Sequence, residues 1–182
     1  MAIHGCPRAS QMRLAAQISV RDYLCPADGC LLTDSEFAAR FRDLLEHQRE
    51  FGLREAHLLT LGRHFRLPSA GKVIVGRNEA ENKALATLRI DNEPLLEPVN
   101  LTGPSALCAG RLSEDSVEVA SQLVATYTKG GMEVDVSVAT ADAATDARSM
   151  CRDRPLEKRL AAPWRISSAS HRRGKKKMEV LT

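Results

Sequence analysis

Between residues 33 and 138 the apolar residues of this chain switch repeatedly between helical and strand spacing, which leaves few folds open to it. Apolar residues recur at helical spacing after Thr33, after Asn78 and after Ser113. Residues 63–67 instead alternate, as in a half-buried strand, and a Pro-Ser-Ala-Gly turn joins them to a returning strand at residues 72–76. Helices interspersed with short strands predict a single compact α+β domain, with a mixed or antiparallel sheet and three main helices.

Local signals place the ends of these elements. Thr33-Asp-Ser-Glu36 is a capping box, which predicts a helix start at Thr33, its hydroxyl and the Glu36 carboxylate each bonding the other's backbone N–H. Asn78 is the expected cap of the second helix, and Ser113 that of the third. The expected strands are residues 63–67, 72–76, 95–100, 105–109 and 132–138.

The end of the chain differs from the rest in pattern and in charge. Asp146 to Thr182 holds 11 Lys or Arg against 4 Asp or Glu, a net charge of +7, so the remaining residues carry −4. Apolar periodicity is lost from Ala139 onward, which predicts a basic, disordered tail over residues 140–182. The run His171–Lys177 either adds non-specific affinity for an anionic partner or only keeps the tail soluble.

Several classes of protein are excluded by what the sequence lacks. No apolar run approaches the roughly 18–20 residues of a membrane span, and Arg8 and Arg13 interrupt the place of a signal peptide. We therefore expect a cytoplasmic protein that has no membrane partner. Phosphate-binding glycine loops, the serine nucleophile elbow and the zinc-protease helix motif are all missing. These absences predict no cofactor.

The cysteines leave three interpretations open. His4, Cys6, Cys25 and Cys30 are residue types that bind zinc, although their spacing differs from that of paired zinc knuckles. Cys30 lies near the start of the first helix, where the helix dipole favours a thiolate, so Cys30, with or without Cys25, is the alternative catalytic candidate. The third interpretation, small residues in turns or in the core, is the one that we adopt, and it predicts no metal.

Five short strings resemble a known family. They are residues 62–68 (Gly-Arg-His-Phe-Arg-Leu-Pro), 72–78 (Lys-Val-Ile-Val-Gly-Arg-Asn), 81–82 (Glu-Asn), 101–107 (Leu-Thr-Gly-Pro-Ser-Ala-Leu) and 25–34 (Cys-Pro-Ala-Asp-Gly-Cys-Leu-Leu-Thr-Asp). The first four resemble the RNA-binding domain called NFACT-R. All five together are similar to the variant that follows a PP-loop adenylating domain in bacterial and archaeal tRNA thiolation proteins.

The resemblance implies a module that binds tRNA or another structured RNA for thiolation. Because the pyrophosphate loop is absent here, it also implies a separate PP-loop subunit and a chain that is not itself an enzyme. It divides the chain into a connector with a Cys-Pro-Ala-Asp-Gly-Cys turn (1–32), an NFACT-R-like domain (33–139) and the tail (140–182). The alternatives are a subunit that relays sulfur through Cys30, and a folded scaffold without RNA affinity.

The candidate RNA contacts lie on and next to the expected hairpin. Alternation should turn His64 and Arg66 outward, so that residues 63–77 form one cationic ridge. The alternative is an ordinary solvated face, and Asn78 is better explained as a helix cap. Aromatic residues are only 4% of the chain, which predicts recognition of backbone and shape rather than base stacking. The candidates are Arg63, His64, Arg66, Lys72, Arg77, Asn78, Asn82 and Lys83.

Overall fold

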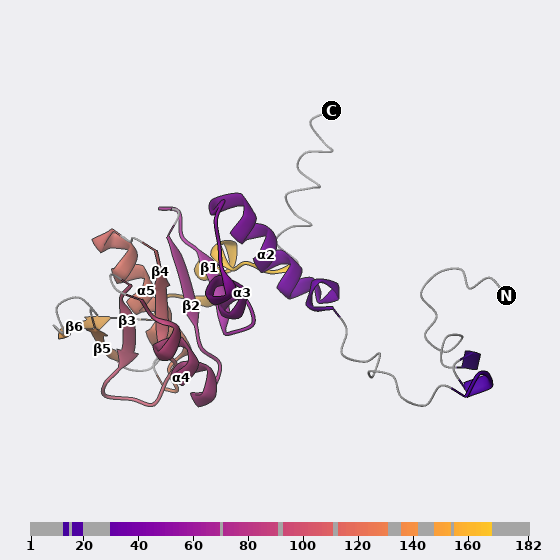
Figure 1. Cartoon of the computed structure of the whole chain (residues 1–182). Helices are drawn as coiled ribbons and strands as arrows, with labels where there is room; N and C mark the ends of the chain where they lie inside the picture. Colours follow the sequence, from indigo (N-terminus) through magenta and orange to yellow (C-terminus); the bar gives the residue numbers. More distant parts are fainter. Residues whose placement is uncertain are drawn as a thin grey trace. The chain divides into compact units, whose positions relative to one another are not determined.

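The computed structural model describes nine stretches of the chain, which divide into two compact units, Met1–Asp34 and Ser35–Thr182. The stretches are residues 13–14, 16–19, 30–69, 71–90, 93–110, 113–130, 136–141, 148–153 and 155–168. In the first unit, the 3-10 turn η1 (Leu31–Thr33) follows Cys30, and the Thr33 hydroxyl donates to the Cys30 carbonyl at 2.7 Å. The second unit is the α+β domain of Figure 1.

Six strands form one sheet in the order β1-β2-β4-β3-β5-β6, and each neighbouring pair is antiparallel. The strands are β1 (Arg63–Arg66), β2 (Lys72–Val75), β3 (Leu95–Pro98), β4 (Ala106–Ala109), β5 (Val136–Ala141) and β6 (Arg148–Asp153). β1 and β2 form the predicted hairpin, with Arg63 opposite Val75 and Arg66 opposite Lys72. The prediction of an α+β domain with an antiparallel sheet is therefore confirmed.

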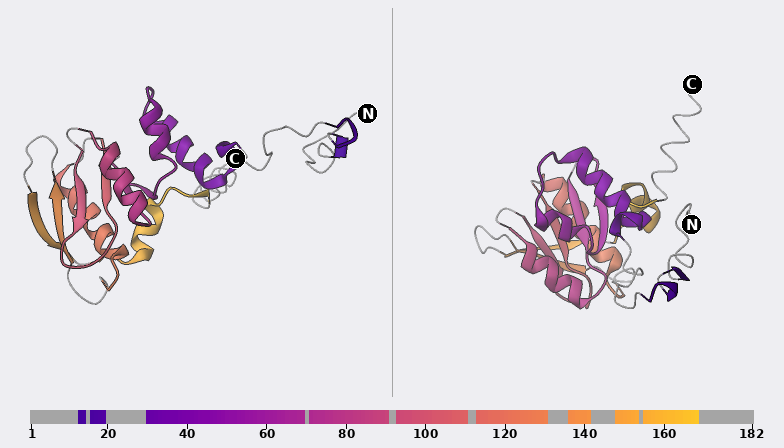
Figure 2. Two further views of the ribbon diagram at one scale, coloured as in Figure 1. Left: turned by 60° about the horizontal axis from the view of Figure 1, so that its bottom comes forward. Right: turned by 45° about the vertical axis from the view of Figure 1, so that its right-hand side comes forward.

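Helices cover both faces of this sheet (Figure 2). One face packs on α5 through Phe65, Val73 and Leu123. The other face packs on α3 and α4, where Ile74 and Leu85 belong to one buried cluster. The helical elements are α2 (Ser35–His47), α3 (Leu53–Leu58), α4 (Glu79–Leu88), α5 (Glu114–Tyr127), α6 (Lys158–Ala161) and the 3-10 turn η2 (Ala162–Trp164).

Because both faces are covered, the expected alternation between buried and exposed residues is wrong for β1. All of β2 is buried, and His64 on β1 is only 1% exposed although it points away from the Phe65 side. A strand buried on both faces needs partners on both faces for its polar side chains, and these partners decide where the predicted site residues lie.

The first predicted helix begins later than its capping box indicates. Thr33 belongs to η1, and α2 begins at Ser35. Glu36 accepts hydrogen bonds from the backbone N–H and the hydroxyl of Ser168, at 3.0 and 2.7 Å, and these bonds hold its pKa below the ordinary value. The carboxylate thus joins α2 to a segment that follows it by more than a hundred residues.

The prediction of a disordered tail over residues 140–182 is wrong for the part that the structure describes. β6, α6 and η2 all lie within it, and Ala161 is buried in the α5 cluster, against which Trp164 also packs. The backbone N–H of Ile166 donates to the His64 carbonyl at 2.9 Å, so this segment covers the outer edge of β1. This part of the chain is ordered by contacts with distant residues, which local periodicity does not indicate. Residues 169–182, with the basic run 171–177, lie outside the described residues.

Candidate nucleic-acid interface

Four loops meet at one end of the sheet, where β1 begins and β2 ends. We call this region the loop end and define it as residues 60–63, 76–83, 102–105 and 127–129, together with Lys158, whose ammonium lies over the Tyr127 ring. Three of the four loops contain the strings that resemble NFACT-R.

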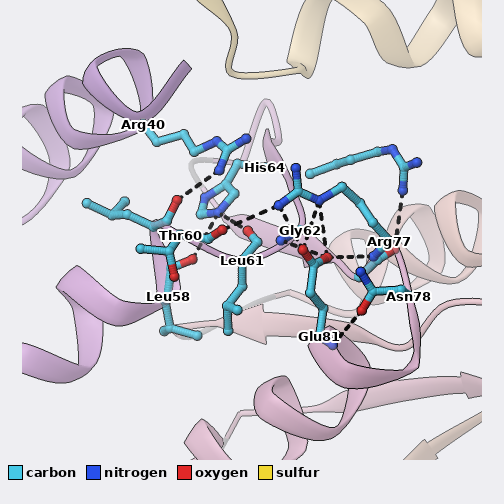
Figure 3. Close-up of polar contacts among 12 residues, drawn as sticks. Arg40, Leu58, Thr60, Leu61, Gly62, His64, Arg77, Asn78 and Glu81 are labelled. Carbon is cyan, nitrogen blue, oxygen red and sulfur yellow. Dashed lines mark hydrogen bonds and ion pairs between the residues drawn. The ribbon is translucent and has the colours of Figure 1, made fainter. Parts of the chain in front are cut away.

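Glu81 joins the loop before β1 to the loop after β2 (Figure 3). One of its carboxylate oxygens accepts from the backbone N–H of Gly62 at 3.2 Å and from that of Arg77 at 2.8 Å. The other is 2.8 Å from a terminal nitrogen of the Arg77 guanidinium. Burial raises the pKa of Glu81, but these donors outweigh it, so the pKa is lower than usual and the carboxylate stays ionised.

Asn78 and Asn82 use their side chains to hold the loop end together. The Asn78 carbonyl oxygen accepts from the Glu81 backbone N–H at 2.9 Å, which confirms the predicted helix cap (Figure 3). Asn82 accepts from the Ser105 backbone N–H at 3.1 Å and donates to the Gly103 carbonyl at 3.5 Å. Both amides are therefore structural parts of the loops that would present RNA contacts.

Two cations stack on one aromatic ring at the loop end. The Arg63 guanidinium carbon lies 4.8 Å from the centre of the Tyr127 ring, and the Lys158 ammonium lies 5.9 Å from it. Lys129 follows two residues after Tyr127, and its backbone N–H donates to the Thr102 carbonyl at 3.3 Å. The side chains of Lys129 and Lys158 are exposed.

These three cations differ from their neighbours in having no carboxylate partner among the described residues. The ion pairs near them join Arg77 to Glu81, Lys83 to Glu79 and Arg159 to Glu157. A cation already paired with a carboxylate gains less from a phosphate than an unpaired one does. Arg63, Lys129 and Lys158 are therefore the best-placed phosphate contacts at this end.

Arg66 and Lys72 point toward α2 instead of toward solvent. The Arg66 guanidinium donates two hydrogen bonds to the carboxylate of Asp43, at 3.0 and 2.7 Å, and the Lys72 ammonium lies 3.3 Å from it. Burial raises the pKa of Asp43, but the two cations more than offset this, and its pKa lies below the ordinary value. Burial lowers the pKa of Lys72, and Asp43 offsets this only in part.

His64 is also turned inward, on the same face of the sheet. Its Nε2 lies 2.9 Å from the Leu61 carbonyl and 3.2 Å from that of Leu58, so this nitrogen carries the proton and donates (Figure 3). Its Nδ1 is buried and has no hydrogen-bond partner among the residues that the structure describes. Burial, and next the nearby charges of Lys72 and Arg40, hold the pKa of His64 well below its usual value, so the ring is neutral.

The low pKa of His64 predicts how stability depends on pH. Below pH 6.5 the unfolded chain binds a proton at this histidine and the folded chain does not, so protonation favours unfolding. The free energy of unfolding should fall by about 1.4 kcal/mol per pH unit from this source. Urea titrations between pH 7.5 and 5 should show the loss, and His64→Gln should remove it. The exposed His57→Gln is the control, and an unchanged slope in His64→Gln would contradict the assignment.

The structure separates the eight predicted RNA contacts into two groups. Arg63, Arg77, Asn78, Asn82 and Lys83 lie at the loop end, whereas His64 and Lys72 are buried and Arg66 is paired with Asp43 on α2. The prediction of one cationic ridge along residues 63–77 is wrong, because Arg63 faces α5 and Arg66 faces α2. Lys129 and Lys158 are not among the RNA contacts predicted from the sequence. Lys129 ends a helix at a Lys-Gly-Gly signal, and Lys158 fell in the segment assigned to the tail.

The cysteine alternatives find no support in the described residues. Cys30 is exposed and precedes the short turn η1, five positions before α2 begins at Ser35, so it is not in the first turn of a long helix. Within the described residues, no group of three or more His, Cys, Asp or Glu is arranged to hold a metal ion. His4, Cys6 and Cys25 lie outside these residues. None of the helices that the structure describes is long and apolar enough to span a membrane.

Comparisons with known proteins agree with the fold and with the four strings between residues 62 and 107. Residues 62–165 match the family described as NFACT protein RNA binding domain. Among solved structures, the chain is similar to the C-terminal part of the fibronectin/fibrinogen-binding protein from Streptococcus suis, with a TM-score of 0.52 and 13% identity. The similarity covers 72% of this chain and 66% of that one, slightly less than two thirds of its length, and concerns the fold alone. No curated protein matches the chain.

Proposed function

We propose that this chain, which belongs to the NFACT RNA-binding domain family, binds a structured RNA through its loop end. The observation that carries the proposal is the gathering of Arg63, Lys129 and Lys158, without carboxylate partners, around loops that contain the family strings. All three residues lie within the matched range 62–165.

The chemistry of the loop end fits contacts to the RNA backbone. Neutralising phosphates supplies a large share of RNA affinity, and each Lys or Arg contact adds to its salt dependence. Tyr127 is half-buried under Arg63 and Lys158, so it orients two cations and is covered by them. Arg77 and Lys83 add charge at the same end, although each is paired with a glutamate.

The finer proposal is that the RNA is tRNA and that the chain presents it to a separate PP-loop subunit for thiolation. Its support is the likeness of residues 25–34 and 72–82 to tRNA thiolation proteins. The exposed apolar residues Leu45 on α2 and Phe51 just after it are candidates for contact with that subunit. A preference for tRNA over a duplex RNA of equal length in a mobility-shift assay would support the finer proposal, and equal affinity would contradict it.

Removing two exposed cations from the loop end tests the RNA-binding proposal. The double variant Lys129→Gln/Lys158→Gln should bind structured RNA about tenfold more weakly at 50 mM salt, because two phosphate contacts are lost. The slope of log K against log salt should become shallower by about 1.5. The measurement is a filter-binding or anisotropy titration with tRNA at three salt concentrations between 50 and 200 mM.

The chain offers a control with the same change in net charge. Arg49→Gln/Arg89→Gln removes two cations outside the loop end, so its affinity and slope should stay close to those of the original protein. If both double variants lose affinity equally, the attraction is a property of the whole surface and the loop end is not the interface.

A further inference from the structure

A second surface feature lies along β1, apart from the loops just described. The segment 163–167 and α2 enclose an open hollow of about 310 Å³. Its lining includes Arg42 and Glu46 from α2, Arg66 from β1, and Trp164 and Arg165 from the C-terminal segment. We call it the Trp164 hollow. Trp164 is the only tryptophan of the chain.

Contacts at several points fix the segment that forms one wall of the hollow. The backbone N–H of Ile166 donates to the His64 carbonyl at 2.9 Å, and Arg165 forms an antiparallel bridge with Phe65. Ser168 donates to Glu36 on α2 from both its N–H and its hydroxyl. Since the wall is joined to both β1 and α2, the hollow is formed before any ligand arrives.

The charges of the hollow favour an anion. Arg66 is already paired with Asp43, which also faces the hollow. Arg42 and Arg165 are exposed, and among the described residues neither forms an ion pair, although the charge of Arg165 also acts on the Glu36 carboxylate. The lining therefore holds three arginines (Arg42, Arg66 and Arg165) and two carboxylates (Asp43 and Glu46). A ligand with one negative charge fits this excess of one positive charge.

We propose that the Trp164 hollow holds one unpaired nucleotide of the bound RNA, its base on the Trp164 indole and its phosphate between Arg42 and Arg165. The inference rests on the proposed function and adds to it a site for a single-stranded part of the RNA. A nucleotide combines a flat ring with a nearby anion, and the lining of the hollow combines a half-buried tryptophan, which also packs against the α5 cluster, with two exposed arginines. A phosphorylated peptide would use the arginines and leave the indole without a matching group.

The hollow and the loop end then have different tasks. The loop end neutralises the backbone of a folded RNA, while stacking on Trp164 requires a base that is free of its partner strand. Only bases in loops, bulges or ends meet that requirement. Low aromatic content excludes a broad stacking platform, but one well-placed indole is enough for one base.

Because the full chain has one tryptophan, its fluorescence reports on this hollow. Adenosine pentamer should quench the emission, and a pentamer with the same phosphates but no bases should bind at least tenfold more weakly. Arg42→Gln/Arg165→Gln should weaken quenching by the adenosine pentamer about tenfold. Trp164→Leu should weaken binding of a labelled pentamer 5-fold to 150-fold by anisotropy, and Trp164→Phe should restore part of it.

Four results would overturn the proposal. They are equal quenching by the base-free pentamer, no quenching at all, tighter binding of a phosphopeptide than of the pentamer, and no effect of Arg42→Gln/Arg165→Gln. The variant Lys129→Gln/Lys158→Gln separates this site from the loop end. It should leave pentamer quenching unchanged while it weakens tRNA binding, so either site can fail without the other.

Discussion

Replacing Asp43 by alanine is expected to lower the free energy of unfolding by about 3–5 kcal/mol, the largest effect that the structure predicts for a single polar side chain. The Asp43, Arg66 and Lys72 side chains are 10%, 19% and 9% exposed, so these charges are largely out of water. Without Asp43, the two cations face each other across the β1–β2 pair and lose the carboxylate that both of them contact. Urea denaturation at pH 7 measures the loss.

Two comparisons separate this effect from the simple loss of a side chain. Glu46→Ala, on the exposed part of the same helix, should change the free energy of unfolding by no more than about 0.5 kcal/mol. The triple variant Asp43→Leu/Arg66→Met/Lys72→Met should recover most of the stability lost in Asp43→Ala, because an apolar cluster no longer contains unpaired charge. A triple variant no more stable than Asp43→Ala would show that packing, and not charge, explains the loss.

The low pKa of Asp43 adds a pH dependence to this cluster. Its carboxyl is easier to ionise when folded than when unfolded, so the contribution to stability is present above pH 3.8, the ordinary value. It is lost as the pH falls through the lowered pKa of the folded state. This loss of stability occurs at a lower pH than the loss caused by protonation of His64 in the unfolded chain.

Gly62→Ala is expected to be the most damaging change at a glycine. Gly62 has a φ of +62°, in the left-handed region, which costs an alanine about 1–2 kcal/mol. An added Cβ would also lie 2.6 Å from the backbone carbonyl oxygen of Val75 on the paired strand. That oxygen cannot move without separating β1 from β2, which adds about 1–3 kcal/mol. Thermal or urea unfolding should therefore show a loss of about 2–5 kcal/mol.

Gly130 provides a matched control for the backbone term alone. Its φ is +78°, and no atom lies within 4 Å of the position that a Cβ would take. Gly130→Ala should therefore cost only the left-handed term of about 1–2 kcal/mol. If both variants lose the same stability, the contact with Val75 has no energetic weight and the close approach of the two loops is not needed.

The features that could be predicted from the sequence depend on neighbours in the chain. The β1–β2 hairpin follows from alternation around a Pro-Ser-Ala-Gly turn, and the Asn78 cap follows from its position three residues before Glu81. The burial of Arg66 could not be predicted in this way, since its partner Asp43 lies 23 residues earlier on a helix. Alternation shows which side chains share a face, but not what covers that face.

The same limit explains which parts of the candidate site were missed. Lys158 and Trp164 lie in a segment that is polar and aperiodic, which on local pattern alone resembles a tail. The contacts that order it are made with α5 and β1, and both are distant in sequence. The family strings, by contrast, led to the loop end because Gly62, Glu81 and Asn82 hold it together.

The bridge between Arg165 and Phe65 joins positions one hundred residues apart, and this has a consequence for how the chain folds. Closing so long a loop costs entropy before any contact rewards it, so the outer edge of β1 is expected to be covered late. Until then, the unpaired backbone groups of that strand are open to strands of other molecules. Refolding at high protein concentration is therefore the stage at which this protein is most prone to aggregate.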